Sequence, residues 1–308
     1  MITTIPIKNE KDIAVPDKTV LVLGYFDGVH KGHQKLFEVA TKASMKDYLP
    51  VVVMTFTESP KLALQPYHPD LMLHIVNQQE REQKLKWHGV EELFLLDFSS
   101  KFASLTAQEF FDTYIKALKP AIIVAGFDYT FGSDKKTADD LKDYFDGEII
   151  IVPPVEDEKG KISSTRIRQA ILDGDVREAG HLLGTPLPSR GMVVHGNARG
   201  RTIGYPTANL VLRDRTYMPA DGVYVVDIEV QRQKYRGMAS VGKNVTFDGE
   251  EARFEVNIFD FSDDIYGESV TVYWLDRVRD MVKFDSVEEL VDQLQKDEEI
   301  ARFWKTDD

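Results

Sequence analysis

Cysteine is absent from the 308-residue sequence, and this absence excludes disulfide bonds, thiolate metal sites and cysteine nucleophiles. The N-terminal residues also lack a basic stretch followed by an apolar run, and no apolar run in the chain is long enough to span a bilayer. We therefore expect a cytoplasmic protein that has no membrane partner.

Positive charge is in short supply as well. The chain has 38 Lys and Arg residues against 51 Asp and Glu residues, which gives a formal net charge of −13. Each contact with a nucleic-acid phosphate needs a cation, so nucleic acid is not an expected partner. Small phosphorylated ligands remain possible, because one compact site needs only a few cations and backbone N–H groups.

The first half of the chain alternates apolar strand-like runs with helical patterns. Strands are expected in TVLVLGYF, PVVVMTF, ELFLLDF, AIIVAGF and EIIIV, with helices over residues 32–46, 78–87 and 106–118. Continuous apolar strands separated by helices are typical of a parallel sheet that is covered on both faces. The pattern predicts an α/β domain with a doubly wound parallel sheet.

The second half has a different pattern. Two short helices are expected over residues 164–173 and 175–183, followed by GTPLPSRG, whose prolines and glycines indicate a connector. Beyond it, closely spaced runs alternate apolar with polar residues, which predicts a small antiparallel β-barrel. Ser286, with Glu289 three residues later, announces a C-terminal helix at the spacing of a capping box. We therefore predict two domains, residues 1–183 and 184–308.

The segment GYFDGVHKGHQ, residues 24–34, follows the first expected strand directly. Ligands of open α/β sheets bind where strands deliver the chain to helix N-termini, and glycines let backbone N–H groups approach phosphates. His30 and His33 are three residues apart at the expected helix start, so both imidazoles can donate hydrogen bonds to one phosphate chain. The bland alternative is a pair of surface or capping histidines. The sequence has no G-x-x-x-x-G-K-[ST] loop.

This segment resembles G-x-F-D-G-V-H-x-G-H, the signature of the bifunctional riboflavin kinase/FAD synthetases, whose N-terminal module is an H-x-G-H nucleotidyltransferase. The resemblance implies that His30 and His33 bind ATP phosphates and stabilise adenylyl transfer. The signature residues expected around ATP are Gly24, Phe26, Asp27 and Gly32.

Two further segments are similar to the same family. ISSTRIR, residues 162–168, matches its S-S-T-R-I-R segment, and GFDYTFG, residues 126–132, is similar to its G-x-D-F-x-F-G stretch. Ser164 and Thr165 can cap a helix while their hydroxyls face phosphate, and Arg166 or Arg168 can neutralise pyrophosphate. Simple helix capping is the competing explanation.

The G-x-D-F-x-F-G-like stretch offers one carboxylate and three aromatic rings. Asp128 is expected to contact the nucleotide or a metal, and Phe127, Tyr129 and Phe131 could stack on adenine or flavin. Because aromatics beside a strand usually pack in a core, we expect at least one of the three to be buried.

The C-terminal half contains GNARGRTIGYPTANL, residues 196–210. A loop with Gly200 and Gly204 brings N–H donors to a phosphate chain, and Thr207 and Asn209 can supply oxygens to Mg²⁺. A wide turn is the alternative for any one glycine. The intact P-T-A-N resembles the riboflavin kinase signature, which implies that Thr207 and Asn209 contact Mg-ATP.

Glu255 lies within FEVNIFDF, residues 254–261, an expected strand otherwise made of alternating apolar residues. Taken alone it would be an outward-facing strand residue. The family assigns the matching glutamate as the base that accepts the proton of the ribityl 5′-hydroxyl during attack on the γ-phosphoryl group.

After Phe131 the family commonly has a basic residue and glycine, whereas this chain has GSDKKTADD, and three further positions depart from the family pattern. Where the family has T-F-x-P-H-P, this chain has Glu58 and Ser59 at the first Pro and the His, and Val245 stands where a Pro usually precedes Thr. We expect these changes to affect flavin binding or the rate of adenylylation.

The sequence therefore predicts two ATP-dependent enzymes in one chain. Riboflavin and ATP would give FMN and ADP, then FMN and ATP would give FAD and pyrophosphate, with Mg²⁺ required in both steps. One alternative is a riboflavin kinase with a weak or lost adenylyltransferase module, motivated by Glu58 and Ser59. The other is a flavin-sensing regulator. The oligomeric state is not indicated.

Overall fold

A computed structural model describes the chain apart from residues 1, 8–9, 16, 197–198, 247–248 and 306–308 and the side chains of residues 10, 199, 243–246 and 249–252. The chain divides into two compact units, Met1–Ser164 and Thr165–Asp308. The boundary between the compact units therefore lies before residue 183, the end of the first predicted domain. The reason is that α7 (Val176–Leu183) packs on the C-terminal strands β11 (Leu187–Val194) and β16 (Ser269–Arg279).

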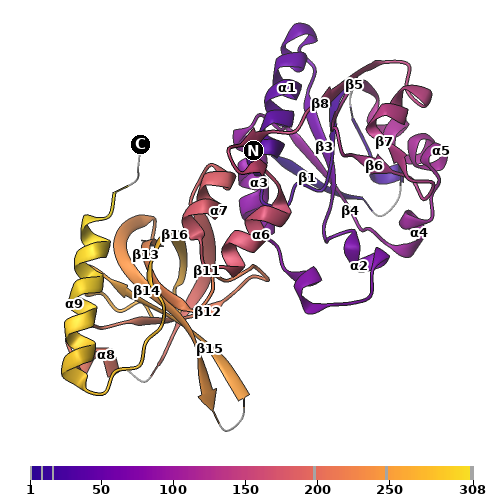
Figure 1. Cartoon of the computed structure of the whole chain (residues 1–308). Helices are drawn as coiled ribbons and strands as arrows, with labels where there is room; N and C mark the ends of the chain where they lie inside the picture. Colours follow the sequence, from indigo (N-terminus) through magenta and orange to yellow (C-terminus); the bar gives the residue numbers. More distant parts are fainter. Residues whose placement is uncertain (1, 8–9, 16, 197–198, 247–248, 306–308) are drawn as a thin grey trace. The chain divides into compact units, whose positions relative to one another are not determined.

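The N-terminal unit is built on a parallel sheet, as predicted, and this sheet has a sixth strand, β1, besides the five expected (Figure 1). Its strand order is β1-β4-β3-β2-β5-β8. The strands are β1 (Thr3–Ile7), β2 (Thr19–Leu23), β3 (Val51–Phe56), β4 (Glu92–Leu96), β5 (Pro120–Gly126) and β8 (Glu148–Val152). The chain leaves β2 toward β3 on one side and later returns to place β5 on the other, so the strand order reverses between β2 and β5. Such a reversal is where open α/β sheets bind ligands.

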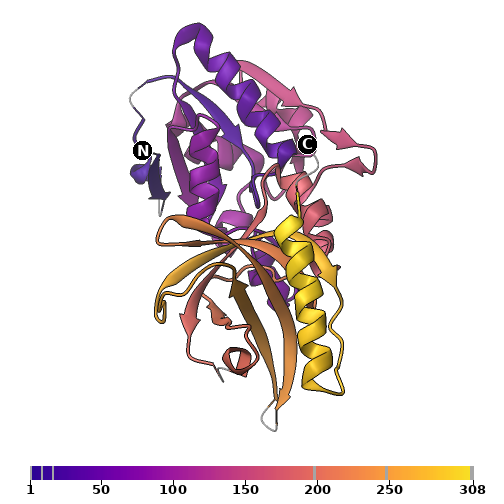
Figure 2. The ribbon, with the colours of Figure 1, turned by 90° about the vertical axis from the view of Figure 1, so that its left-hand side faces the viewer.

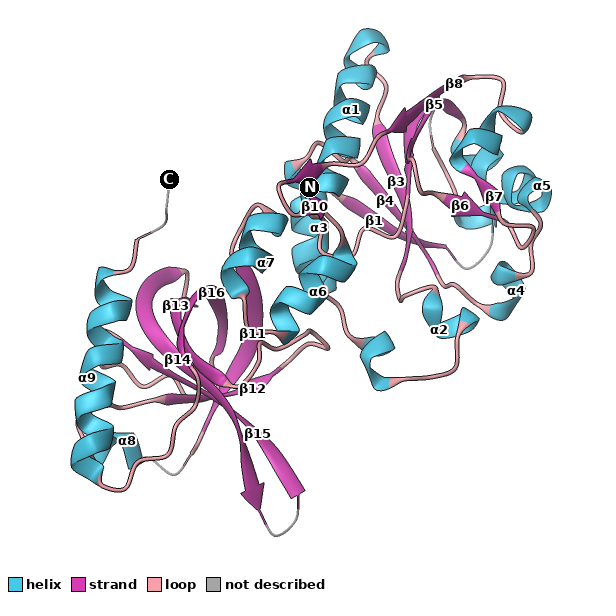
Figure 3. Ribbon diagram, in the orientation of Figure 1, coloured by secondary structure: helices cyan, strands magenta, loops and turns pink. Residues whose placement is uncertain are grey.

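Both faces of this sheet are buried, which explains the continuous apolar strands. Alternate residues of β2 pack on opposite faces, Leu21 and Leu23 in one cluster and Val20 and Val22 in the other. Figure 3 shows helices around the sheet. Helices α1 (Lys31–Asp47) and α3 (Gln78–Trp87) supply apolar residues to the second cluster.

The remaining helical segments of this unit are short. They are η1 (Glu10–Asp12), α2 (Lys61–Leu64), η2 (Pro69–Met72), α4 (Ser100–Ala103), α5 (Ala107–Phe110), η3 (Phe111–Ile115), η4 (Lys116–Leu118) and η5 (Ala138–Asp143). The helix expected over residues 106–118 is therefore α, then π, then 3₁₀ in its hydrogen bonding. The unit also has two small hairpins, β6 (Thr130–Phe131) with β7 (Lys136–Thr137) and β9 (Glu156–Asp157) with β10 (Gly160–Lys161).

The C-terminal unit is a closed antiparallel barrel, which confirms the second predicted architecture. Its order is β11-β12-β15-β14-β13-β16, and pairing of β11 with β16 closes it. Besides β11 and β16 the strands are β12 (Ala208–Leu212), β13 (Gly222–Val230), β14 (Gln233–Thr246) and β15 (Gly249–Ile258). Helices α6 (Ser164–Leu172), which begins at the last residue of the N-terminal unit, and α8 (Arg199–Thr202) are short.

A long helix, α9 (Val287–Phe303), lies along β13 and β14 (Figure 2). Asp297 of this helix is fully buried and accepts hydrogen bonds from Arg279 Nε and Nη2 of β16, at 3.0 and 2.7 Å. Ser286 caps the helix by accepting the N–H of Glu289, as predicted. The Glu289 carboxylate accepts from the N–H of Asp285, so the capping box itself is not closed.

Among the helices that the structure describes, none is both long and apolar enough to cross a membrane.

Candidate active sites

The loop after β2 carries the N-terminal signature at the carboxyl edge of the sheet. Phe26 and Val29 adopt φ of 58° and 48°, values that non-glycine residues rarely take. Asp27 holds this strained loop in place: its Oδ1 accepts the N–H of Ile75 at 3.0 Å, and its carbonyl accepts the Ser164 hydroxyl at 3.0 Å. Both contacts join Asp27 to other segments of the same unit and so fix the shape of the loop. Strained backbone of this kind clusters at functional sites.

The two signature histidines stack on each other. His30 is the N-cap of α1, and its Nδ1 accepts the N–H of His33 at 3.3 Å. The rings lie 3.6 Å apart between centroids at 18°, and Phe26 meets the ring of His33 edge-on at 5.2 Å. A neutral His30 whose Nδ1 accepts must carry its proton on Nε2.

Glycines make this close arrangement possible. A Cβ on Gly24 would lie 2.6 Å from the ring of Phe26, and one on Gly32 would lie 3.0 Å from His30 Cε1. The same Cβ on Gly32 would also lie 3.4 Å from the carbonyl oxygen of Ile162. Segment 162–164 therefore abuts the start of α1, which brings the first serines of ISSTRIR beside the histidines.

His33 is a neutral hydrogen-bonding group at pH 7. Burial, then the neighbouring His30, then the charge of Lys161 hold the pKa of His33 well below its usual value. Its Nδ1 is buried and has no hydrogen-bond partner among the described residues. His33 thus offers a hydrogen bond to an anion without offering charge.

The turn after β5 lies at the same edge as the loop after β2. Asp128 accepts a 2.5 Å hydrogen bond from Lys161 Nζ, which lies 4.5 Å from the centroid of the Phe127 ring. Phe131 is buried in the core and Tyr129 packs against it, whereas Phe127 is 42% exposed. Sequence reasoning missed Lys161, although it stands directly before ISSTRIR.

The other residues of that motif belong to the C-terminal unit, which begins at Thr165. Thr165 is exposed and Arg168 is half-buried. Arg166 forms an ion pair with Glu178 of α7, donating from Nε at 3.0 Å and also from Nη2. In this structure its guanidinium is engaged within the C-terminal unit, so its expected role with pyrophosphate stays a prediction.

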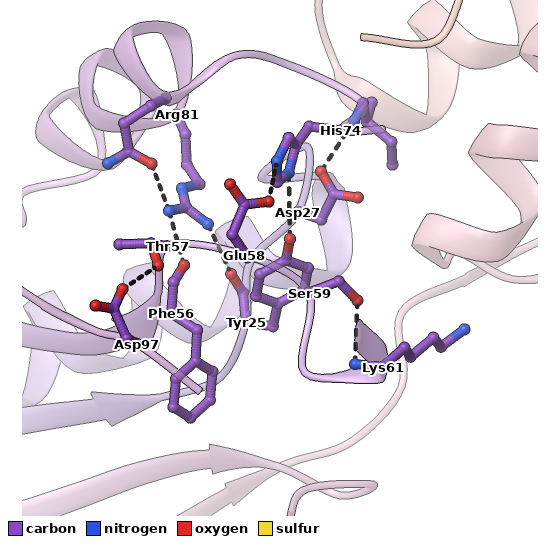
Figure 4. A network of polar contacts seen from close by, with 12 residues as sticks. Tyr25, Asp27, Phe56, Thr57, Glu58, Ser59, Lys61, His74, Arg81 and Asp97 are labelled. Atoms are coloured by element: carbon purple, nitrogen blue, oxygen red, sulfur yellow. Dashed lines mark hydrogen bonds and ion pairs between the residues drawn. The ribbon is translucent and has the colours of Figure 1, made fainter. Parts of the chain in front are cut away.

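The two departures after β3 are part of a polar network (Figure 4). Glu58 Oε2 lies 3.2 Å from His74 Nε2, and His74 Nδ1 lies 3.2 Å from the hydroxyl of Tyr25 in the signature loop. Ser59 Oγ accepts the N–H of Lys61 at 3.4 Å. Buried Arg81 donates to the carbonyls of Phe56 and Tyr25, at 2.9 and 3.4 Å. Glu58 thus helps to hold the signature loop.

The C-terminal signature residues meet on neighbouring strands. Asn209 of β12 is directly opposite Glu255 of β15, and the Thr207 hydroxyl donates to Glu255 Oε2 at 3.4 Å. The Glu255 side chain is only 14% exposed, so it does not point into bulk solvent. Arg253, which sequence reasoning missed, donates to both carboxylate oxygens of Glu255, at 2.7 and 2.9 Å.

The glycine-rich loop wraps closely around these residues. A Cβ on Gly196 would lie 2.3 Å from Asn209 Nδ2, and one on Gly200 would lie 2.1 Å from the Tyr205 carbonyl oxygen. Gly204 has φ of 86°, the left-handed conformation that favours glycine. The Val245 side chain lies outside the described residues, so its departure from the family pattern stays a sequence observation.

Comparison with known proteins also divides the chain into two successive parts. A family model described as FAD synthetase matches residues 12–166, and one described as riboflavin kinase matches residues 183–305. A bifunctional riboflavin kinase/FMN adenylyltransferase of Listeria monocytogenes is 39% identical, over 92% of this chain and 91% of that protein. The chain belongs to this bifunctional family. The Bacillus subtilis protein of the same name is also 39% identical, over 92% of each chain.

A solved structure of similar sequence carries a different description. The crystal structure described as a macrolide-efflux protein from Streptococcus pneumoniae is 81% identical, with a TM-score of 0.97, over 99% of this chain and 100% of that one. The fold described here is therefore shared with an experimental structure along nearly the whole chain.

Proposed function

We propose that the two units perform consecutive steps of flavin cofactor synthesis. The barrel transfers the γ-phosphoryl group of ATP to riboflavin, which gives FMN and ADP. The α/β unit then transfers the adenylyl group of a second ATP to FMN, which gives FAD and pyrophosphate. Support comes from each unit bringing its own signature residues together, stacked imidazoles in one and Thr207, Asn209 and Glu255 in the other.

In the barrel, Glu255 accepts the proton of the ribityl 5′-hydroxyl as its oxygen attacks the γ-phosphorus. The new P–O bond forms while the bond to the β-phosphate oxygen breaks, and ADP leaves with those electrons. Arg253 orients Glu255 through two charge-assisted hydrogen bonds. N–H groups of the loop through Gly200 and Gly204 are the expected donors to the triphosphate.

Mg²⁺ is the metal that this site fits. The Thr207 hydroxyl and the Asn209 amide are oxygen donors on the strand and loop facing Glu255, and such hard oxygens suit Mg²⁺, which usually shares its coordination with substrate phosphates. When bound, the ion neutralises triphosphate charge.

In the α/β unit, a phosphate oxygen of FMN attacks the α-phosphorus of ATP, and the bond to the β-phosphate oxygen breaks. This nucleophile is already ionised at pH 7, so the site needs no general base. His30 and His33 donate hydrogen bonds to the phosphate chain as negative charge moves to pyrophosphate. The Ser164 hydroxyl and the loop from Gly24 to Gly32 border the same space.

A chromatographic flavin assay tests this proposal. Purified protein with riboflavin and Mg-ATP should form FMN and then FAD, and with FMN and Mg-ATP it should form FAD and pyrophosphate. EDTA should stop both reactions. If FMN accumulates and no FAD forms, even when FMN is supplied, the protein is a riboflavin kinase without adenylyltransferase activity. That result would support the alternative motivated by Glu58 and Ser59. Flavin binding without ATP turnover would instead support the sensor.

The description of the Streptococcus pneumoniae structure suggests macrolide transport as a rival activity. Flavin chemistry is favoured because the two matching family models describe an FAD synthetase and a riboflavin kinase, and the signature residues of both occur in the expected order. Cytoplasmic location and the lack of a nucleic-acid partner stay predictions from the sequence.

A further inference from the structure

The β9–β10 hairpin brings one lysine to the histidine pair. Lys161 is the last residue of β10, and the carbonyl oxygen of the next residue, Ile162, lies 3.4 Å from where a Cβ on Gly32 would be. The Lys161 ammonium contacts Asp128 at 2.5 Å and the Phe127 ring at 4.5 Å. Its charge reaches His33, because it contributes to lowering the pKa of that imidazole. The ammonium therefore lies between the turn after β5 and the start of α1.

The ammonium in this position supplies a positive charge that His33 lacks. ATP brings about four negative charges at pH 7, and adenylyl transfer concentrates negative charge on the departing pyrophosphate. His33, whose pKa is lowered chiefly by burial, offers a hydrogen bond but no charge. Arg81, a nearby cation of the same unit, is buried and donates to main-chain carbonyls after β2 and β3. Lys161, with 41% of its side chain exposed, can turn toward an anion.

We propose that Lys161 is a phosphate-binding residue of the adenylyl-transfer site, which exchanges Asp128 for the β- and γ-phosphates of ATP and holds pyrophosphate as it leaves. This inference rests on the proposed FMN adenylyltransferase activity. The exchange costs little, because Lys161 and Asp128 are 41% and 60% exposed and such surface ion pairs contribute weakly to stability. Asp128 and Phe127 keep the ammonium near the site until the nucleotide binds.

A structural tie is the competing role for Lys161. The Lys161–Asp128 pair joins the β9–β10 hairpin to the turn after β5, and a loosened hairpin would impair every substrate of this site. The reverse reaction separates the two roles. In it, FAD and pyrophosphate give FMN and ATP: a pyrophosphate oxygen bonds to the adenylyl phosphorus, and the bond to the FMN phosphate oxygen breaks. Pyrophosphate is the substrate that Lys161 would contact.

The experiment compares Lys161→Met, Lys161→Arg and Lys159→Met in steady-state kinetics of the reverse reaction. Lys161→Met should raise the KM for pyrophosphate about 10- to 100-fold, the range for a lost hydrogen bond to a charged group, with a much smaller effect on the KM for FAD. Lys161→Arg should recover most of this loss, because it restores the charge. Lys159→Met removes an exposed cation from the same hairpin and should behave like the unmodified protein.

Formation of FMN from riboflavin measures folding and concentration in every variant. Equal increases in the KM values for pyrophosphate and FAD, or no recovery in Lys161→Arg, would overturn the phosphate-binding role and leave the structural tie. Unchanged kinetics in Lys161→Met would also overturn it. If the unmodified protein neither makes FAD nor consumes it with pyrophosphate, the proposed adenylyltransferase activity fails, and the role of Lys161 fails with it.

Discussion

In the proposed function, the two units bind the same cosubstrate, ATP, with different chemical groups. In the α/β unit the signature residues are stacked imidazoles, of which His33 is neutral, beside a lysine. In the barrel they are a hydroxyl and an amide around a carboxylate that an arginine clamps. The nucleophiles explain the difference: the phosphate of FMN is an anion already, whereas the 5′-hydroxyl of riboflavin must lose a proton. A site needs a base only when its nucleophile arrives protonated.

Glu255→Gln tests the base half of this comparison and should have the largest effect. Glutamine keeps the size of the side chain but cannot accept the proton, so the kcat for FMN formation should fall about 10²- to 10⁴-fold. FAD formation from supplied FMN should continue at the unmodified rate, because that reaction uses the other unit. Chromatography of both products gives the two rates. An equal loss of both activities would show that the base or the division of labour is wrong.

His33→Ala tests the donor half. Loss of one preorganised donor to a charge-developing phosphate should lower the kcat for FAD formation about 10²- to 10³-fold, while FMN formation is unchanged. His30 has a second role as the N-cap of α1, so it calls for a different substitution. His30→Asn retains a capping oxygen and removes the imidazole. An unaltered FAD rate in both variants would refute the phosphate role of the pair.

More of the fold than of the sites could be predicted from the sequence. Helix α3 begins and ends where predicted, and five parallel strands were found because burial on both faces makes them uninterrupted apolar runs. Strand β1 was missed, since Pro6 weakens its pattern. Among the described residues it is an edge strand that pairs only with β4, and a proline is tolerated in such a strand.

Site residues that lie close together in the sequence could also be predicted. His30 and His33 meet because one helical turn separates them. Arg253 could have been found, since residues i and i+2 of a strand share a face and it stands two before Glu255. Lys161 could not, because its relation to His33 and Asp128 depends on the hairpin, which spacing does not encode. The pairing of Glu58 with His74 likewise depends on how a long connection folds back.

Gly196→Ala sharpens the comparison at the level of the loops. The added Cβ would lie 2.3 Å from Asn209 Nδ2, so the amide must move away from Thr207 and Glu255. Loss of one contact to Mg-ATP should raise the KM for ATP in FMN formation about tenfold. FAD formation should be unchanged. Gly180→Ala, in the same unit, is the steric control, because its Cβ would lie 3.6 Å or more from its neighbours, which is ordinary van der Waals contact. No change in the kinase KM would contradict the crowding of Asn209.

The charge state of His33 gives the smallest expected effect and tests whether the α/β site is neutral. Burial and neighbouring groups depress the pKa of His33, so the folded state binds its proton only well below pH 6.5. The unfolded state takes up that proton near pH 6.5, so this residue removes stability as the pH falls below 6.5, by up to about 1.4 kcal/mol per pH unit. At pH 6 an ordinary imidazole is about three-quarters protonated, whereas ¹⁵N NMR should show the His33 ring neutral.

Removal of the nearby lysine adds a second step to the same measurement. Because the charge of Lys161 contributes to lowering the pKa of His33, Lys161→Met should move that pKa upward, toward its ordinary value. The larger contribution, burial, remains, so the shift should be partial. Lys159→Met should leave the titration where it was. An imidazolium signal for His33 at pH 7 in the unmodified protein would contradict the neutral site, and the α/β unit would then meet ATP with charge on the imidazoles themselves.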